Sequence, residues 1–307
     1  MPFHDREYGL DGVLVQRFLT EVSQAGSPWA AQHNAVLDQV AASARARGRV
    51  FAAMWDASGA PDNGWADMVK NDWTNVVANH TSNPAYLHEG GKPVVALFGL
   101  GLANHQPTPS AADAVALITW LKQRAYVIGS GPYWWRQGGH DALPASAGYA
   151  AVHSAFDAVM PWSVGRWASA AGFKSTDLAS ADAAFCAGRG QDYAPIAFAG
   201  FSFHNSDSSK KLNSIPRMGG AFLQAQIDAY LAVGGDATFF YVAMFDEVNE
   251  GTAVYKAAAT KADAPVNAEF VTLDSDGTPL PADHYLKMVG TFTAASHARG
   301  GGDEEEA

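Results

Sequence analysis

Three observations in the sequence predict an α/β fold, and more specifically a (β/α)8 barrel of the TIM type. Short apolar runs alternate along the chain with segments of helical periodicity, which is typical of parallel strands linked by helices. The chain has 307 residues, a length that suits a single barrel. The turn Gly99-Leu100-Gly101 is followed by Leu102-Ala103-Asn104, so no glycine-rich dinucleotide fingerprint is completed. We expect one barrel domain over residues 1–298 and a disordered acidic tail over residues 299–307.

The expected elements alternate from the N-terminus onward. Runs of apolar residues, many of them β-branched or aromatic, predict strands at 12–18, 49–56, 93–98, 125–129, 156–162, 195–201 and 239–245. Apolar residues three and four positions apart predict helices at 29–47, 65–77, 111–124, 219–233 and 284–295. Gly48 stands where a glycine commonly ends a helix, and Ser110 stands where a serine commonly caps one.

An eighth strand has two interpretations. Residues 270–273 could supply it, but the following Asp274-Ser275-Asp276-Gly277 is typical of a turn in a hairpin or surface loop. Alternatively, the first strand of a standard barrel lies upstream of Met1. We favour the second interpretation, in which the barrel lacks its first strand in this chain.

Composition limits the partners that we expect. The net charge of -11 disfavours nucleic acid and anionic membrane surfaces, so a neutral or cationic ligand fits better. No apolar run is long enough for a membrane span, and the first residues lack the pattern of a signal peptide, which predicts a soluble protein. Its location stays open: cytoplasmic, or secreted if a leader was removed. The single cysteine, Cys186, offers neither a disulfide framework nor a thiol cluster for zinc. We expect no cofactor, and the sequence leaves the oligomeric state open.

A cluster of acids follows the apolar run at 239–245. Asp246, Glu247 and Glu250 stand where the carboxyl end of a parallel strand would place them in a site. The alternative is that they begin a helix, with Asp246 or Asn249 as its cap and the glutamates next to its N-terminus. Cleavage of a glycosidic bond needs two carboxyl groups, and at a strand end that turns Glu247 and Glu250 can face one cleft. Asp246 would then support the pair.

Several segments together resemble the glycoside hydrolase family 71/99-like proteins, whose founding activities are endo-α-1,3-glucanase and endo-α-mannosidase. They are F-D-E-V-N-E-G-T-A-V-Y-K at 245–256, Y-G-L-D-G-V-L-V-Q-R-F at 8–18, N-P-A-Y-L-H-E-G-G-K-P-V-V-A-L-F-G at 83–99, M-P-W-S-V-G-R-W at 160–167 and I-P-R-M-G-G-A-F-L at 215–223. The resemblance implies a (β/α)8 barrel in which Glu247 assists attack by the sugar's own 2-hydroxyl. Glu250 would act as acid and then as base. Tryptophans flank the family 99 pair, whereas Val248 and Asn249 stand between the glutamates here.

Other candidates stand at the ends of the remaining strands, where rings can stack on sugars and polar groups can bind hydroxyls. The candidate substrate-binding residues are Gln16, Arg17, Trp55, Asp56, Tyr133, Trp134, Trp135, Trp162, Arg166 and His204. Trp55 and Trp162 could equally belong to the core, and His204 could simply be exposed. The two arginines could serve to neutralise the acids. Arg217, after Pro216, is expected to be structural.

The alternatives to glycosidase chemistry have weaker signals. Asp246, Glu247 and His204 could form a metal site, but no closely spaced histidine pair supports one. No G-x-S-x-G elbow suggests a serine nucleophile. We therefore expect an α-glycosidase acting on a neutral poly- or oligosaccharide of the α-mannan or α-glucan type. The alternatives are a non-catalytic carbohydrate-binding protein on a degenerate barrel, or a protein that acts through a partner.

Overall fold

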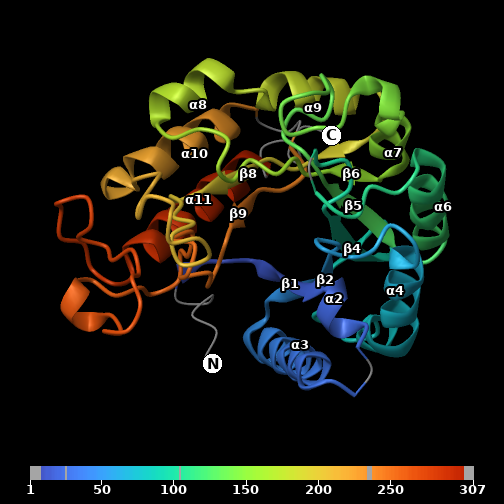
Figure 1. The fold of residues 1–307 in the computed structure, drawn as a ribbon, viewed down its shortest axis with the longest axis horizontal. Coiled ribbons are helices and arrows are strands. Elements are labelled where there is room, and N and C mark those ends of the chain that lie inside the picture. The colour runs from blue at the N-terminus through green and yellow to red at the C-terminus, as the bar shows by residue number, and fades with distance from the viewer. Residues whose placement is uncertain (1–7, 25, 104, 234–236, 301–307) are drawn as a thin grey trace. The chain divides into compact units, whose positions relative to one another are not determined.

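A computed structural model of the chain describes residues 8–24, 26–103, 105–233 and 237–300 (Figure 1). The described residues form two compact units. Unit 1 contains Asp11–Trp162 and Gly190–Asp192, and unit 2 contains Tyr8–Leu10, Ser163–Arg189 and the chain from Tyr193 onward. The expectation of one barrel domain over residues 1–298 remains a prediction.

Unit 1 is built on a mainly parallel sheet. Its strands are β1 (Gly12–Phe18), β2 (Val50–Asp56), β3 (His88–Glu89), β4 (Lys92–Phe98), β5 (Tyr126–Ser130) and β6 (Ala158–Val159), followed by β7 (Asp192–Tyr193), within which the unit boundary falls. The strand order is β1-β2-β4-β5-β6-β7, and the short β3 pairs antiparallel with β4. The central strands are almost completely buried, as expected for a parallel sheet covered on both faces.

The helices of unit 1 begin and end largely as their sequences predict. They are α2 (Leu19–Val22), α3 (Pro28–Arg47), α4 (Trp65–Asp72), the π-helical η1 (Trp73–Val77), α5 (Ala78–His80), α6 (Ala111–Lys122), the 3-10 turn η2 (Ala145–Ala147) and α7 (Tyr149–Ala155). Gly48 ends α3 with a φ of 63°, and the Ser110 hydroxyl accepts a hydrogen bond from the Asp113 N–H at the start of α6. Both predicted helix boundaries are therefore confirmed.

Unit 2 contains a shorter sheet and more irregular chain. Its elements are α8 (Ala170–Thr176), α9 (Ala179–Ala187), β8 (Ile196–Phe198), the 3-10 turn η3 (Met218–Gly220), α10 (Ala221–Val233), β9 (Tyr241–Ala243), the 3-10 turn η5 (Lys261–Asp263) and α11 (His284–Gly300). The strands β8 and β9 pair in parallel, with Ile196 opposite Tyr241. The buried Gln226 of α10 donates to the Phe198 carbonyl and accepts from the Phe198 N–H, so α10 is fixed to β8.

Some expected elements differ in length from the observed ones. The strands expected at 156–162, 195–201 and 239–245 shorten to β6, β8 and β9, because a strand extends only as far as a neighbour pairs with it. The strand considered at 270–273 does not form, and the Gly277 N–H donates to the Asp274 carbonyl in the expected turn. Helix α11 continues through Gly300, so the tail predicted from residue 299 begins as helix; residues 301–307 lie outside the described residues.

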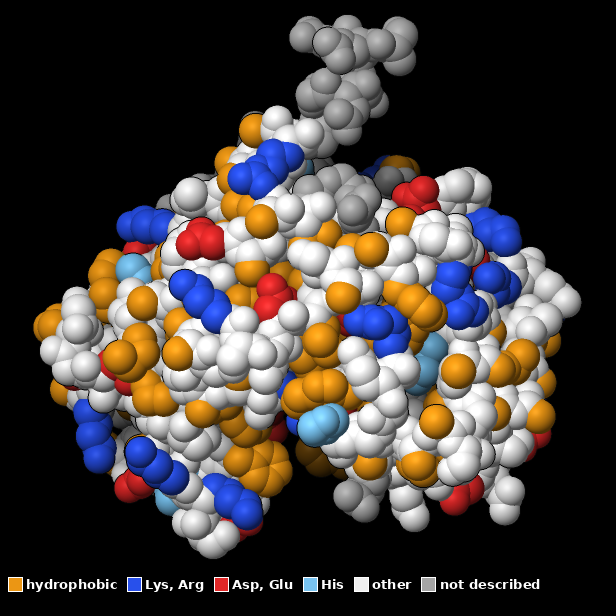
Figure 2. Space-filling model, turned by 90° about the horizontal axis from the view of Figure 1, so that it is seen from above, with side chains coloured by type: hydrophobic (Ala, Val, Ile, Leu, Met, Phe, Trp, Pro, Cys, Tyr) orange, Lys and Arg blue, Asp and Glu red, His pale blue; other side chains and the backbone are white. Residues whose placement is uncertain are grey.

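No helix in the described part of the chain has the length and apolar character needed to cross a membrane. On the face drawn in Figure 2, Lys and Arg side chains lie interspersed with acidic and hydrophobic ones. That face therefore carries mixed charge.

Candidate active site

The three candidate acids lie on a closed loop that follows β9. The loop is closed at its base because the Val254 N–H donates to the Met244 carbonyl at 3.0 Å and the Tyr255 N–H donates to the Phe245 carbonyl at 2.8 Å. No helix forms anywhere in residues 244–260, all of which are described. The alternative that the acids begin a helix is therefore wrong.

Hydrogen bonds from neighbouring segments fix the interior of this acid loop, defined as residues 246–253. The Ser202 N–H donates to the Glu250 carbonyl at 2.7 Å, and Asn205 Nδ2 donates to the Asn249 carbonyl at 3.0 Å. Gly251 has a φ of 64°, and a Cβ there would lie 3.2 Å from Val271 Cγ2. Only glycine fits this position without strain or a shift of Val271.

The environment of the acids suits acid–base chemistry. Glu247 and Glu250 are half-buried, whereas Asp246 is exposed. Burial raises the pKa of the Glu250 carboxyl, because a half-buried carboxylate loses part of its hydration. A carboxyl with a raised pKa stays protonated closer to neutral pH, as a general acid requires.

Tyr241 is a neighbour of the acids that the sequence did not single out. Burial raises the pKa of its hydroxyl, and the negative charges of Glu247 and Asp246 raise it further. The hydroxyl therefore interacts electrostatically with both carboxylates, and it stays protonated beside them. In the sequence Tyr241 is one aromatic residue in an apolar run, which gave no signal beyond the core of a strand.

The other two candidates of unit 2 have partners of their own. His204 Nε2 lies 3.4 Å from Glu269 Oε2, and its Nδ1 lies 2.7 Å from the Lys210 carbonyl oxygen. Arg166 is half-buried, and its main-chain N–H donates to the Ser163 carbonyl in a turn. The described residues contain no group of three His, Cys, Asp or Glu side chains placed to hold a metal ion, so the structure does not assemble the alternative site of Asp246, Glu247 and His204.

In unit 1, the four candidates on β1 and β2 divide between the two faces of the sheet. Gln16 Nε2 donates to Asp56 Oδ2 at 2.8 Å, and Asp56 Oδ1 accepts from the Ser58 N–H at 2.7 Å. Arg17 and Trp55 each stand next to one of this pair along a strand, where successive side chains point to opposite faces. The structure therefore brings Gln16 and Asp56 together and separates them from Arg17 and Trp55.

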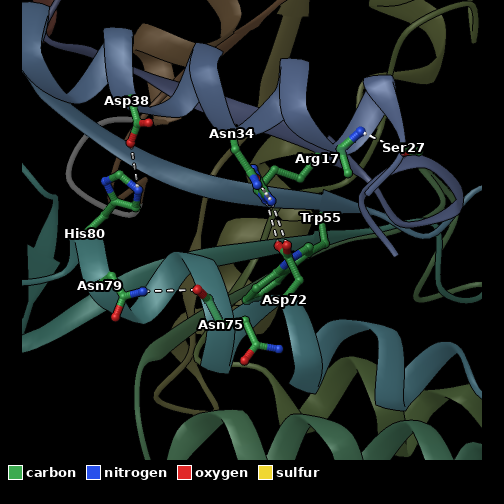
Figure 3. Close-up of polar contacts among 10 residues, drawn as sticks. Arg17, Ser27, Asn34, Asp38, Trp55, Asp72, Asn75, Asn79 and His80 are labelled. Atoms are coloured by element: carbon green, nitrogen blue, oxygen red, sulfur yellow. Dashed lines mark hydrogen bonds and ion pairs between the residues drawn. The ribbon is translucent and has the colours of Figure 1, made fainter. Parts of the chain in front are cut away.

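Arg17 and Trp55 meet at Asp72 on the face covered by helices (Figure 3). Arg17 Nη2 lies 2.6 Å from Asp72 Oδ1, and Arg17 Nε and Trp55 Nε1 donate to Asp72 Oδ2 at 2.7 and 2.8 Å. A further bond runs from Arg17 Nη2 to Asn34 Oδ1 on α3. Both side chains are at most 1% exposed. The expectation that they reach a sugar at the strand ends is corrected: they join the sheet to α3 and α4.

The aromatic candidates of unit 1 also differ from one another in exposure. The Asp141 carboxylate accepts hydrogen bonds from the main-chain N–H groups of Tyr133 and Trp134 at 2.8 and 3.1 Å. These bonds close the loop of residues 133–141. Tyr133 and Trp135 are buried in the core.

Two other aromatic candidates are less buried. The half-buried Trp134 stacks on His140, with ring centroids 4.5 Å apart. The half-buried Trp162 packs edge-on against Phe98 at 4.8 Å. Trp134 and Trp162 are therefore the aromatic candidates of unit 1 that keep part of their surface exposed.

The strands and helices define an α/β protein with a parallel sheet, and solved structures share this fold. No family model matches the sequence, and no curated protein matches it. A GH99 endo-α-mannosidase from Bacteroides thetaiotaomicron matches with a TM-score of 0.69 and 14% identity, over 97% of this chain and 80% of the other. A GH99 endo-α-mannosidase from the same organism, in complex with bis-tris propane, matches with a TM-score of 0.70 and 16% identity, over 98% and 86% of the two chains.

A third solved structure, described as a glycoside hydrolase-like protein, matches with a TM-score of 0.60 and 16% identity, over 94% of this chain and 83% of the other. At 14–16% identity, the likeness to these structures shows the fold alone. The chain has a GH99-like α/β fold, and the fold class predicted from the sequence is confirmed.

Proposed function

We propose that the chain is a glycoside hydrolase that cleaves α-glycosidic bonds with Glu247 and Glu250 as its catalytic pair. The observation that carries this proposal is that two half-buried glutamates stand three residues apart on one closed loop, and that burial raises the pKa of Glu250. The GH99-like fold supports it, since the solved structures with this fold include endo-α-mannosidases. Asp246, which is exposed beside the pair, adds negative charge and supports it.

The resemblance to families 71 and 99 implies the order of steps. In the first step, Glu247 takes the proton of the sugar's 2-hydroxyl, the freed oxygen attacks the anomeric carbon, and the bond to the leaving oxygen breaks as Glu250 protonates that oxygen. In the second step, Glu250 takes a proton from water, and the water oxygen attacks the anomeric carbon. The bond to the 2-oxygen then breaks, and that oxygen regains its proton from Glu247. The net reaction adds one water and retains the anomeric configuration.

We assign a neutral glycan of the α-mannan or α-glucan type as the substrate. The net charge of -11 disfavours an anionic polymer. Gln16, Trp134 and Trp162 remain candidate sugar contacts because all three are only half-buried, and the buried Asp56 would orient Gln16 through the hydrogen bond that it accepts. For Arg17 and Trp55 we assign a supporting role instead.

The test measures hydrolysis of α-mannan, α-1,3-glucan and aryl α-glycosides by the wild-type chain and by Glu247→Gln and Glu250→Gln. Each variant should lose activity by about 100-fold or more while its free energy of unfolding changes little. The matched control is Glu89→Gln, the same change at an exposed residue of β3. NMR of the first product should show the retained anomer. Near-normal activity in both loop variants would overturn the assignment.

The second candidate function is carbohydrate binding without catalysis, which the half-buried Trp134 and Trp162 rings would also serve. Calorimetry separates the two functions. A binding protein would keep its glycan affinity in both glutamate variants and would release no product on long incubation.

A further inference from the structure

Arg217 connects the acid loop to the rest of unit 2. Its Nη2 donates to the carbonyl oxygens of Gly251 and Ala253, each at 2.8 Å. Gly251 directly follows Glu250, so the two bonds fix the main chain next to that carboxyl-bearing residue. The side chain of Arg217 is 3% exposed.

Packing on two sides immobilises Arg217 itself. Its guanidinium carbon lies 4.5 Å from the centre of the Tyr285 ring on α11, and a Cβ at Gly200 would lie 2.7 Å from Arg217 Cγ. The next residue is anchored as well, because the Met218 N–H donates to Asp276 Oδ2 at 2.7 Å. Arg217 is therefore held in place by α11 and by the turn at Asp276, and it in turn holds the acid loop.

Burial of the Arg217 guanidinium costs free energy, so a contribution to stability alone does not explain why a charged residue stands here. Burial lowers the pKa of the Arg217 guanidinium, because a charge withdrawn from water is disfavoured. Tyr285 and Asp276 favour the charge but offset only part of the effect of burial, and the described hydrogen bonds of the guanidinium go to two main-chain carbonyls. Apolar packing commonly stabilises a buried site as well as a buried charge does. What an apolar residue cannot provide is two charge-assisted bonds to neighbouring carbonyls.

We propose that Arg217 is a positioning residue for the acid pair, which holds the chain after Glu250 so that this carboxyl stays half-buried at the reacting bond. The role rests on the proposed glycosidase function and adds a residue to it, since the sequence alone suggested only a structural part for Arg217.

The test compares Arg217→Met, Arg217→Lys and the control Gln226→Leu. The control removes buried hydrogen bonds to the β8 main chain in the same unit without touching the acid loop. The first readout is the pKa of the Glu250 carboxyl, followed by carbon-13 NMR and assigned by its loss in Glu250→Gln. In Arg217→Met this pKa should fall toward its ordinary value, because a loosened loop hydrates the carboxyl. Arg217→Lys should restore part of the shift.

The second readout is turnover. Arg217→Met should lower kcat by about 10- to 100-fold with a smaller effect on KM, since a displaced acid group harms the chemical step more than binding. Gln226→Leu should lower the free energy of unfolding and leave both readouts near wild type. If Arg217→Met does not fold, Arg217→Lys gives the same comparison with smaller changes.

Two results would overturn the inference. One is a Glu250 pKa and a kcat within about two-fold of wild type in the folded Arg217 variants. The other is an equal change in Gln226→Leu. Absence of any glycan cleavage by the wild-type chain would instead contradict the proposed function, and the NMR titration would still report whether Arg217 holds Glu250 in place.

Discussion

At the scale of single residues, one carboxylate connects three elements of unit 1. Asp72 on α4 accepts from Arg17 of β1 and from Trp55 of β2, and all three side chains are buried. The pair of Arg17 and Asp72 is bidentate, which is the strongest geometry for a guanidinium and a carboxylate. Loss of Asp72 would leave a buried charge and a buried indole N–H without their acceptor.

We expect Asp72→Asn to lower the free energy of unfolding by about 3 kcal/mol, because breaking one side of a buried ion pair leaves its partner uncompensated. The matched control is Asp67→Asn on the same helix, where the carboxylate is exposed and lies 3.5 Å from Lys70 Nζ. The control should change stability by less than about 0.5 kcal/mol. Urea unfolding of both variants measures the difference, and equal losses would contradict this account of Asp72.

At the scale of elements, the acid loop depends on a glycine that two other segments crowd. Gly251 combines a positive φ with crowding, since a Cβ added there would lie 3.2 Å from Val271 Cγ2 and 3.4 Å from Ser202 Cβ. Gly190 has the same φ of 64°, yet a Cβ there would meet no atom within 4 Å. A substitution at Gly190 therefore tests backbone strain alone, whereas the same substitution at Gly251 tests strain and crowding together.

Gly190→Ala should lower the free energy of unfolding by about 1 kcal/mol, the cost of a left-handed conformation for a residue with a Cβ, and leave turnover unchanged. Gly251→Ala adds the displacement of Val271 or of the loop, so we expect a larger loss of stability and about a ten-fold loss of kcat. Thermal unfolding and steady-state kinetics report the two quantities. Wild-type turnover in Gly251→Ala would mean that the loop tolerates the shift.

At the scale of the whole molecule, one buried histidine makes stability depend on pH. His153 is 4% exposed between the rings of Trp135 and Tyr149, and burial lowers its pKa to about 4. The ring is therefore neutral in the folded chain at pH 6. In the unfolded chain a histidine takes up a proton near pH 6.5.

Between about pH 6.5 and pH 4 the unfolded state thus binds one more proton than the folded state, so the free energy of unfolding decreases as the pH falls. The expected loss from this residue is about 3 kcal/mol across that range. Urea unfolding at several pH values measures it. His153→Phe should flatten this part of the profile, whereas the same comparison for His88→Gln, at an exposed position, should leave it unchanged. A wild-type slope in His153→Phe would contradict the assignment.

The sequence predicts the fold well because helices and buried strands carry their periodicity locally. Gly48 predicts where α3 ends, and Ser110 predicts where α6 begins. Strand lengths are less predictable, since β6, β8 and β9 end where their neighbours stop pairing. Pairing is a property of segments distant in the sequence.

The candidate site is predictable only in part, for the same physical reason. The acids stand out as a cluster after an apolar run. That they occupy a loop instead of a helix depends on bonds such as Ser202 N–H to the Glu250 carbonyl. The period of a strand implies that only one of Gln16 and Arg17 can face a given side. Which one does so depends on Asp72, far along the chain.

The closure of the acid loop at Met244–Val254 and Phe245–Tyr255 has an evolutionary consequence. Because these bonds fix both ends and further bonds fix the main chain between them, the exposed side chains of Asp246, Val248 and Asn249 can change while the loop keeps its course. A new arrangement of acids can thus arise at these positions without rebuilding the strand that precedes the loop.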